Sequence, residues 1–439
     1  MAGGTWKVQN KVRPGVYIDF VAAASPNTVM ADRGVATMPL IMDWGPEGEV
    51  IEVLSSDLLN GNSRTKIGYG ASDSKSLLFC LCLSNCYKLL AYRLNRGEKA
   101  GAALGNLTAT AKYSGLRGND ISLAVLANDS AFEVVTFVDG SEEDRQTVSA
   151  ISELADNDWL DFSGSEALAA VAVTALTGGT NGSVESTDYE DYFTAMKVLS
   201  WQVMGIPSSD ASLPPLLKAY ILDLRDNKGK KVQGVAYNYL ADHEGMISSK
   251  QGFKTAAATV SAADFVAWLT GAEAGTSIDE SLTYRLIDDA VEIVGEMTDD
   301  QVGAALQAGW LVISKRVDGK IIVEQDINTL VSFVNGQKDK NFRKNRVIRT
   351  LDEIGNSVAL LFELYYIGKV DNSAAGRDLF KADIINYFKS LQAVGAIQNF
   401  AGADDITVTA GSEADSVVVQ LAIQPVDSME KLYMTVEVA

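Results

Sequence analysis

The chain has 439 residues, a length that predicts two to four domains rather than one small module. Hydrophobic residues make up 47% and charged residues 21%, which is close to an average globular protein and excludes disordered, collagen-like and disulfide-scaffold classes. The 57 acidic residues outnumber the 37 basic ones and give a net charge of −20, which disfavours nucleic acid and anionic membranes as partners because both are negative.

Three cysteines, Cys80, Cys82 and Cys86, lie within one apolar stretch. Such a cluster is typical of buried free thiols in a protein made in a reducing compartment. The first residues lack the apolar core of a signal peptide, and no run of about 20 apolar residues could span a bilayer. We therefore expect a soluble protein that is synthesised in a cytoplasm and does not insert into a membrane.

The first 98 residues mix extended and helical patterns. Val16, Ile18 and Phe20 occupy alternate positions, a pattern that predicts a strand near the N-terminus, detached from the elements that follow it. Asp73 is placed to cap a helix that continues through residues 77–83. Further extended runs cover residues 34–54, interrupted by a turn at 44–48, and residues 87–94. This first region of the chain ends at the turn formed by residues 95–97.

Residues 107–176 consist of short β-type runs separated by Gly, Asn and Asp turns. The segment 99–180 carries 4 basic and 12 acidic residues, so its net charge is −8. Residues 176–182 (LTGGTNG) have turn chemistry and indicate a domain boundary. The sequence therefore predicts an inserted acidic β-rich domain over residues 99–182.

Helix-like and strand-like stretches then alternate over residues 188–326, which predicts a sheet with crossover helices. We assign residues 183–336 to this α/β domain. Near its end, two β-type runs flank Asp318 and Gly319. An Asp-Gly pair supplies the positive φ angles of a type I′ turn, so the runs predict a hairpin of that type.

Two long helical patterns cover residues 340–366 and 376–396, and two β-type runs cover 416–424 and 432–438. The last run predicts a strand that ends the protein. One face of it carries Leu432, Met434, Val436 and Val438, and the other carries Tyr433, Thr435 and Glu437. The fold class is therefore mixed α/β (α+β) and multidomain: an inserted β-rich domain, an α/β core, and a C-terminal helical and β domain with extended terminal strands.

No motif indicates catalysis or cofactor binding. His243 is the only histidine, so a Ser-His-Asp or Cys-His mechanism would have to use it, and no nucleophile elbow accompanies it. We interpret His243 as a solvated loop residue. The cysteine cluster lacks a fourth soft ligand, and the glycine-rich residues 178–182 lack the lysine of a phosphate-binding loop. The sequence predicts no catalytic residue, no metal site and no cofactor.

One stretch, residues 338–349, carries six basic residues and one acidic residue, a local charge of +5 in a protein of −20. Such a patch is typical of contact with an acidic partner. The alternative is a solvated helix face balanced by acids of its own fold, among them Asp352 and Glu353. The basic residues are Lys338, Lys340, Arg343, Lys344, Arg346 and Arg349.

The two terminal strands raise a separate question, because an unpaired strand exposes backbone N–H and C=O groups that invite another chain. Either both ends fold back onto their own domain, or they pair with neighbouring subunits. Head-to-tail donation is a heterologous contact, and when its rotation does not close it yields a helical filament or a stack of rings.

Several segments, taken in order, resemble the tail sheath proteins of contractile bacteriophage tails, and more specifically those of phages and phage-tail-like bacteriocins of Gram-positive hosts. The likeness extends from residue 14 to the end of the chain. It rests on residues 14–20 (PGVYIDF), 33–36 (RGVA), 176–182 (LTGGTNG), 326–330 (DINTL), 345–352 (NRVIRTLD), 366–369 (YIGK), 376–377 (GR) and 426–434 (VDSMEKLYM).

This resemblance implies a structural subunit that polymerises helically around an inner tube and contracts to drive the tube through a bacterial envelope. It implies a division into an N-terminal arm (1–24), the first part of the sheath core (25–98), an outer domain (99–182), the α/β domain (183–336) and an inner domain that ends in a strand arm (337–439). The strand arms shared between subunits would use Val16, Tyr17, Ile18, Phe20, Leu432, Tyr433, Met434, Val436 and Val438.

The implied partners are other copies of the chain, the inner tail tube protein, and the baseplate and tail terminator proteins, but no nucleic acid. The implied location is a virion or phage-tail-like particle made in the bacterial host cytoplasm. The basic stretch supplies the candidates for tube contact, with Arg377 and Lys381 as an alternative set. The competing hypothesis is a cytoplasmic α/β enzyme with an unrecognised site.

Overall fold

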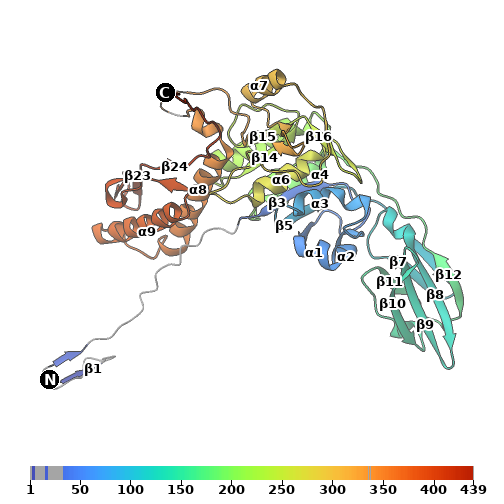
Figure 1. Cartoon of the computed structure of the whole chain (residues 1–439). Helices are drawn as coiled ribbons and strands as arrows, with labels where there is room; N and C mark the ends of the chain where they lie inside the picture. The colour runs from blue at the N-terminus through green and yellow to red at the C-terminus, as the bar shows by residue number, and fades with distance from the viewer. Residues whose placement is uncertain (1, 5–14, 18–32, 335, 337, 439) are drawn as a thin grey trace.

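The computed structural model describes residues 2–4, 15–17, 33–334, 336 and 338–438. Figure 1 shows a central α/β body, a β-rich body at one end, and a helical C-terminal body, coloured orange to red, on the other side. The fold is therefore mixed α+β and multidomain, as the sequence predicts. Near the N-terminus, the short strands β1 (Ala2–Gly4) and β2 (Gly15–Tyr17) pair in parallel.

A six-stranded sheet forms the centre of the molecule, and its strand order is β15-β14-β13-β3-β5-β4. All neighbours are parallel except β4 and β5, which are antiparallel. This confirms the sheet with crossover helices that the alternating pattern predicts. The strands are β3 (Val35–Leu40), β4 (Val50–Leu54), β5 (Lys88–Arg93), β13 (Val203–Gly205), β14 (Gln233–Tyr237) and β15 (Met246–Ser249).

Helices cover both faces of this sheet, because apolar side chains project from its strands on both sides. Met38 of β3 shares one core with Phe265 of α6, whereas Leu90 of β5 shares the other with Tyr192 of α4. Asp73 caps the turn that leads into α3, as predicted, by accepting from the Lys75 amide at 2.8 Å. The helices are α1 (Ser55–Asn60), α2 (Ser63–Ile67), η1 (Ser74–Ser76), α3 (Leu77–Leu83), α4 (Ser186–Met196), α5 (Leu213–Leu222), the π-turn η4 (Asp223–Asn227) and α6 (Phe265–Gly275).

Smaller elements lie before and after α6 along the chain. The predicted hairpin is present, but its turn is not type I′: Gly319 has a φ of 82°, whereas Asp318 is not among the residues with positive φ. The Gly319 amide donates to the Arg316 carbonyl at 2.8 Å, which is the pattern of a type I turn followed by a left-handed glycine. The elements are β16 (Gly252–Lys254), β17 (Thr259–Val260), β18 (Glu292–Val294), α7 (Asp299–Ala308), β19 (Ile313–Lys315) and β20 (Ile321–Val323).

The β-rich body consists of two sheets, ordered β10-β9-β8-β12 and β11-β7-β6, around a separate apolar core. Two chain segments connect it to the central body, and they pass so closely that a Cβ on Gly182 would lie 1.6 Å from the Arg96 carbonyl oxygen. Its elements are β6 (Gly101–Leu104), β7 (Leu107–Ala111), η2 (Leu116–Asp120), β8 (Ile121–Asn128), β9 (Ala131–Val138), β10 (Ser141–Val148), η3 (Ile151–Glu153), β11 (Leu160–Ser163) and β12 (Val171–Ala175).

The C-terminal body has its own aromatic core and consists of two long helices and two short hairpin-like sheets, β21-β24 and β22-β23. Both helices agree with the predicted helical patterns. The elements are η5 (Lys340–Arg343), α8 (Asn345–Tyr365), α9 (Ala374–Ala393), β21 (Ile397–Gln398), η6 (Gly402–Asp404), β22 (Ile406–Ala410), β23 (Val417–Leu421) and β24 (Gln424–Pro425).

The prediction of a strand at residues 432–438 is wrong for the single chain, whose last strand is β24. A strand needs a neighbour for its backbone groups, and residues 431–438 have no ladder partner in the described part of the chain. At the other end, Val16 and Tyr17 lie in β2, while Ile18 and Phe20 fall outside the described residues.

Candidate functional site

The C-terminal segment, residues 431–438, is exposed along its whole length, and we call it the C-terminal arm. Its large apolar side chains are 69–92% exposed on both faces of the predicted strand. Globular subunits rarely present so continuous an apolar segment unless it binds something. These side chains belong to Leu432, Tyr433, Met434, Val436 and Val438.

The arm departs from a well-fixed root. Glu430 is largely buried, and its carboxylate accepts hydrogen bonds from Thr283 Oγ1 at 2.9 Å and from Gln325 Nε2 at 2.5 Å, and it pairs with Lys344 Nζ. Burial alone would raise the pKa of Glu430, but these hydrogen bonds, above all that from Lys344, outweigh burial and hold the pKa below its ordinary value. Glu430 is therefore an ionised anchor beneath the arm.

The basic stretch does not form one exposed face. Arg349 is fully buried and pairs with Glu273 and with Asp326, the latter at 2.8 Å, so the prediction that Arg349 faces a tube is wrong. Lys344 pairs with Glu430, and Arg346 donates to Ser428 Oγ at 2.9 Å. Both side chains therefore bind the last residues of their own subunit, which differs from the expectation of free cations.

The other candidates vary in availability. Lys338 pairs with Glu244 at 2.6 Å, whereas Lys340 is exposed and Arg343 is half-buried, with a pKa lowered by burial. On α9, Arg377 donates to the Asn372 side chain at 2.9 Å. Lys381 donates to the Ala403 carbonyl at 3.1 Å. Of the candidates, Lys340 is the most exposed cation without a hydrogen bond or ion pair in the described structure.

A buried charge network joins α8 to the central body. Arg349 lies between Glu273 of α6 and Asp326, and Asn345 donates to both carboxylates, at 3.0 Å and 2.9 Å. One turn along α8, Asp352 receives a bidentate pair from Arg225 of η4 at 2.6 and 2.8 Å. Removing one partner of a buried pair costs about 3–5 kcal/mol, so this network holds α8 rigidly on the central body.

The root of the N-terminal segment contacts the same network. Arg33 donates to the Glu273 carbonyl oxygen at 3.2 Å. Burial and the positive charge of Arg349 lower the pKa of Arg33 to about 10. Arg33 and Glu430 therefore both lie near the beginning of α8, since Arg349 contacts Glu273 and Lys344 contacts Glu430.

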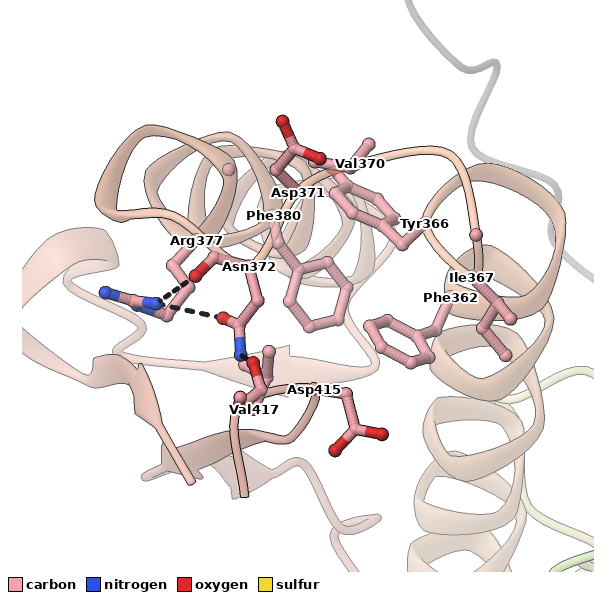
Figure 2. A pocket seen from close by; sticks show the side chains of 13 residues that line it. Phe362, Tyr366, Ile367, Val370, Asp371, Asn372, Arg377, Phe380, Asp415 and Val417 are labelled. Carbon is pink, nitrogen blue, oxygen red and sulfur yellow. Dashed lines mark hydrogen bonds between the residues drawn. The ribbon is translucent and has the colours of Figure 1, made fainter. Parts of the chain in front are cut away.

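A pocket of about 470 Å³ lies where α8, α9 and the β22–β23 hairpin meet. Figure 2 shows Phe362, Tyr366 and Phe380 along its wall. Asn372 donates to the carbonyl oxygens of Ala414 and Ser416 at 2.8 and 2.9 Å. These contacts fix the α8–α9 loop against the hairpin, and the Arg377 guanidinium is hydrogen-bonded to Asn372 of the same loop (Figure 2).

The strand edge of β23 is a surface that the sequence did not reveal. β23 pairs with β22 on one side only among the described strands, and its Val418 and Val419 side chains are 45% and 37% exposed. An open apolar edge of this kind can accept another strand. The β-branched residues of the sequence mark β23 as a strand but do not show which of its edges is left open.

The residues considered for chemistry have structural roles. His243 is not the solvated residue that we expected: its side chain is only 14% exposed, and its Nδ1 accepts from the Gly245 amide at 2.9 Å. Cys82 and Cys86 are buried free thiols, as predicted, whereas Cys80 is free but only partly buried. Among the described residues, no cluster of three or more His, Cys, Asp or Glu could hold a metal ion. None of the described helices is both long and apolar enough to cross a membrane.

Comparison with known proteins gives matches over most of the chain. Three domain families match in order: the phage tail sheath protein β-sandwich domain at residues 95–181, the central domain at 182–329 and the C-terminal domain at 337–439. The phage-like element PBSX protein XkdK of Bacillus subtilis is 33% identical across the full length of both chains.

Solved structures agree. The sheath tail protein of Desulfitobacterium hafniense is 43% identical with a TM-score of 0.86, covering 96% of this chain and 99% of that one. The contracted helical sheath protein of the anti-feeding prophage shares the fold, with a TM-score of 0.58 at 12% identity over 97% and 99% of the two chains. Because full-length relatives exceed 30% identity and three sheath domains match in order, the chain belongs to the family of phage tail sheath proteins, the structural subunits of contractile tails.

Proposed function

We propose that copies of this chain polymerise helically around an inner tail tube, and that contraction of the resulting sheath drives the tube through a bacterial envelope. The sheath belongs to a virion or phage-tail-like particle, and its subunits are synthesised in the host cytoplasm. Baseplate and tail terminator proteins contact its two ends. The subunit acts as a mechanical element rather than as an enzyme, in keeping with the structural role of its family.

The C-terminal arm is the observation that carries this proposal. Its eight residues span about 26 Å when extended, which is long enough to reach a neighbouring subunit. Its exposed apolar side chains and unpaired backbone favour addition to another sheet. Donation from each copy to the next is heterologous, so it builds a helix or stacked rings rather than a closed dimer.

The open edge of β23 supports an acceptor role for the C-terminal body. Val418 and Val419 on that strand are partly exposed and would be covered by an added strand. A pair of strands is only marginally stable alone, and a third strand adds both ladder hydrogen bonds and apolar contacts. Subunits linked in this way remain connected while their bodies change orientation.

Charge supports an orientation of the subunit on the tube. The β-rich domain, with its net charge of −8, lies at the far end of the molecule from the C-terminal body (Figure 1). Charged groups are costly to remove from water, which favours an outer position for this domain. The C-terminal body then faces the tube. The exposed Lys340 is the preferred candidate for a weak, salt-screened contact with the tube.

Electron microscopy of the purified chain tests the proposal. The wild type should form tubes or stacked rings, and deletion of residues 431–439 should leave a folded subunit that forms neither. A triple serine substitution of Leu432, Met434 and Val436 should impair assembly more strongly than the same substitution of Tyr433, Thr435 and Glu437 on the other face. Tubes of wild-type appearance from the truncated chain would contradict the proposal.

A further inference from the structure

The C-terminal segment changes character between Glu430 and Lys431. Up to Glu430, it is tied to its own subunit: the Val426 amide donates to the Ala396 carbonyl at 3.0 Å, and Ser428 accepts from Arg346 at 2.9 Å. From Lys431 onward, every described residue is exposed and makes no hydrogen bond or ion pair within the described structure.

Three separate parts of the chain converge on the Glu430 carboxylate. Thr283 and Gln325 lie on two loops of the central body, and Lys344 directly precedes α8. Only 10% of the Glu430 side chain is exposed, so these contacts are largely shielded from water. Asp427 adds a longer ion pair to Lys344, at 3.8 Å. The polar contacts of Glu430 form the last attachment of the segment to its subunit, and we call them the clasp.

We propose that Glu430 is a positioning residue: it fixes the point from which the C-terminal arm leaves its subunit, and thereby the register in which the arm pairs with a second copy of the chain. This inference rests on the proposed function, because it concerns how the arm is donated. It adds a specific residue and a specific consequence, since the clasp governs the order of the polymer rather than its formation.

The physical reason is the period of a strand. Side chains alternate between faces, so a slip of one residue turns the apolar face of the arm away from its acceptor. Without the clasp, only the Arg346–Ser428 hydrogen bond and the longer Asp427–Lys344 ion pair hold the segment beyond Val426. When these weaker contacts open, residues 427–430 join the free segment and add about 13 Å of slack. The arm can then pair in several registers. Subunits should still associate, because the apolar residues of the arm remain, but their spacing should vary.

Two readouts of Glu430→Ala separate anchoring from assembly. The first is cleavage of the soluble subunit before Asp427 by an Asp-specific protease, which needs local release of the chain. This rate should rise about tenfold, since proteolysis follows the population of the open form. The second is the sharpness of layer lines in electron micrographs of the polymer, which should be lost although polymers form.

Two further variants complete the design. Glu296→Ala removes the same charge from an exposed surface position and should change neither readout. Glu430→Gln keeps the size and acceptor oxygen but loses the ion pair, so its cleavage rate should fall between those of the wild type and Glu430→Ala. Far-UV circular dichroism at the assay temperature should be the same in all four chains, which separates local release of the segment from a general loss of the fold.

An unchanged rate of cleavage before Asp427 in Glu430→Ala would show that Glu430 does not anchor the arm. Faster cleavage combined with layer lines as sharp as those of the wild type would overturn the role in register. A wild-type chain that forms no polymer would instead contradict the proposed function, and the cleavage rates would still decide whether Glu430 anchors the arm.

Discussion

The two acidic residues that contact the buried Arg349, Glu273 and Asp326, are expected to differ in protonation state. Burial raises the pKa of Glu273 well above its ordinary value, and the nearby Asp326 raises it further. Burial opposes ionisation of Asp326 too, but Arg349 and donated hydrogen bonds hold the pKa of Asp326 below its ordinary value. We therefore predict that Glu273 keeps its proton, so that Asp326 is the ionised carboxylate opposite Arg349.

The raised pKa of Glu273 fixes the sign of the pH dependence. A carboxyl whose pKa is raised by folding contributes stability that is fully present below its unfolded pKa and is lost as the pH rises towards and through its folded pKa. Between those two values, the loss is about 1.4 kcal/mol per pH unit. Glu273→Gln needs no proton, so its stability relative to the wild type should rise from pH 5 to pH 8.

Asp326→Asn should behave differently. It removes the ionised partner of Arg349 and should cost about 3 kcal/mol, the lower end of the range for breaking a buried pair, because Glu273 can then ionise in its place. Urea unfolding followed by tryptophan fluorescence can compare both variants at pH 5 and pH 8, with buried Trp268 of α6 as a local reporter. Equal losses in the two variants at both pH values would refute a protonated Glu273.

Three further outcomes are expected. Gly182→Ala should lower the free energy of unfolding by more than about 1 kcal/mol, because the new Cβ would meet the Arg96 carbonyl. Gly105→Ala should lower it less, because Gly105 has a similar φ of 64° but no atom near the position of the new Cβ. Equal losses would show that the contact with Arg96 is unimportant. Lys340→Glu should weaken binding of the extended sheath to its tube by about 0.2–1 kcal/mol per subunit, an effect that high salt should reduce, whereas unchanged binding would remove Lys340 from the tube face. Limited proteolysis of assembled sheath should cut first within residues 99–182, and first cuts beyond residue 338 would contradict the outer position of the β-rich domain.

The sequence predicted the central sheet and its helices well because the signals there are local. The period-two runs, the Asp73 cap and the turns are each set by neighbouring residues, and the structure has elements at nearly the same positions. The hairpin turn shows the limit of a dipeptide rule: Gly319 alone takes the left-handed conformation, since the longer connection places Asp318 in an ordinary turn position.

Charged contacts were the least predictable feature. Sequence proximity suggested Asp352 and Glu353 among the acids that balance the basic stretch. The actual partners of Arg349 are Glu273 and Asp326, which lie 76 and 23 residues away, because folding brings α6 and the loop before η5 against α8. Local charge counting cannot separate a buried cation from an exposed one when the compensating acids come from distant segments.

The C-terminal segment shows the opposite case: its local pattern predicts a strand, but the described part of the chain gives it no ladder partner. The alternation over residues 432–438 is typical of a strand, and both faces are exposed in the subunit. An alternating apolar segment that pairs with no strand of its own subunit favours contact with another molecule, because its apolar side chains are otherwise left in water.

A density map of the assembled sheath, obtained by electron cryomicroscopy, tests the central claim most directly. The map should show residues 431–438 crossing to an adjacent subunit and lying as a strand beside its C-terminal body, with Glu430 still bound to Lys344 of the donor. Density that folds residues 431–438 back onto their own subunit, in an assembly held together by other surfaces, would contradict the account.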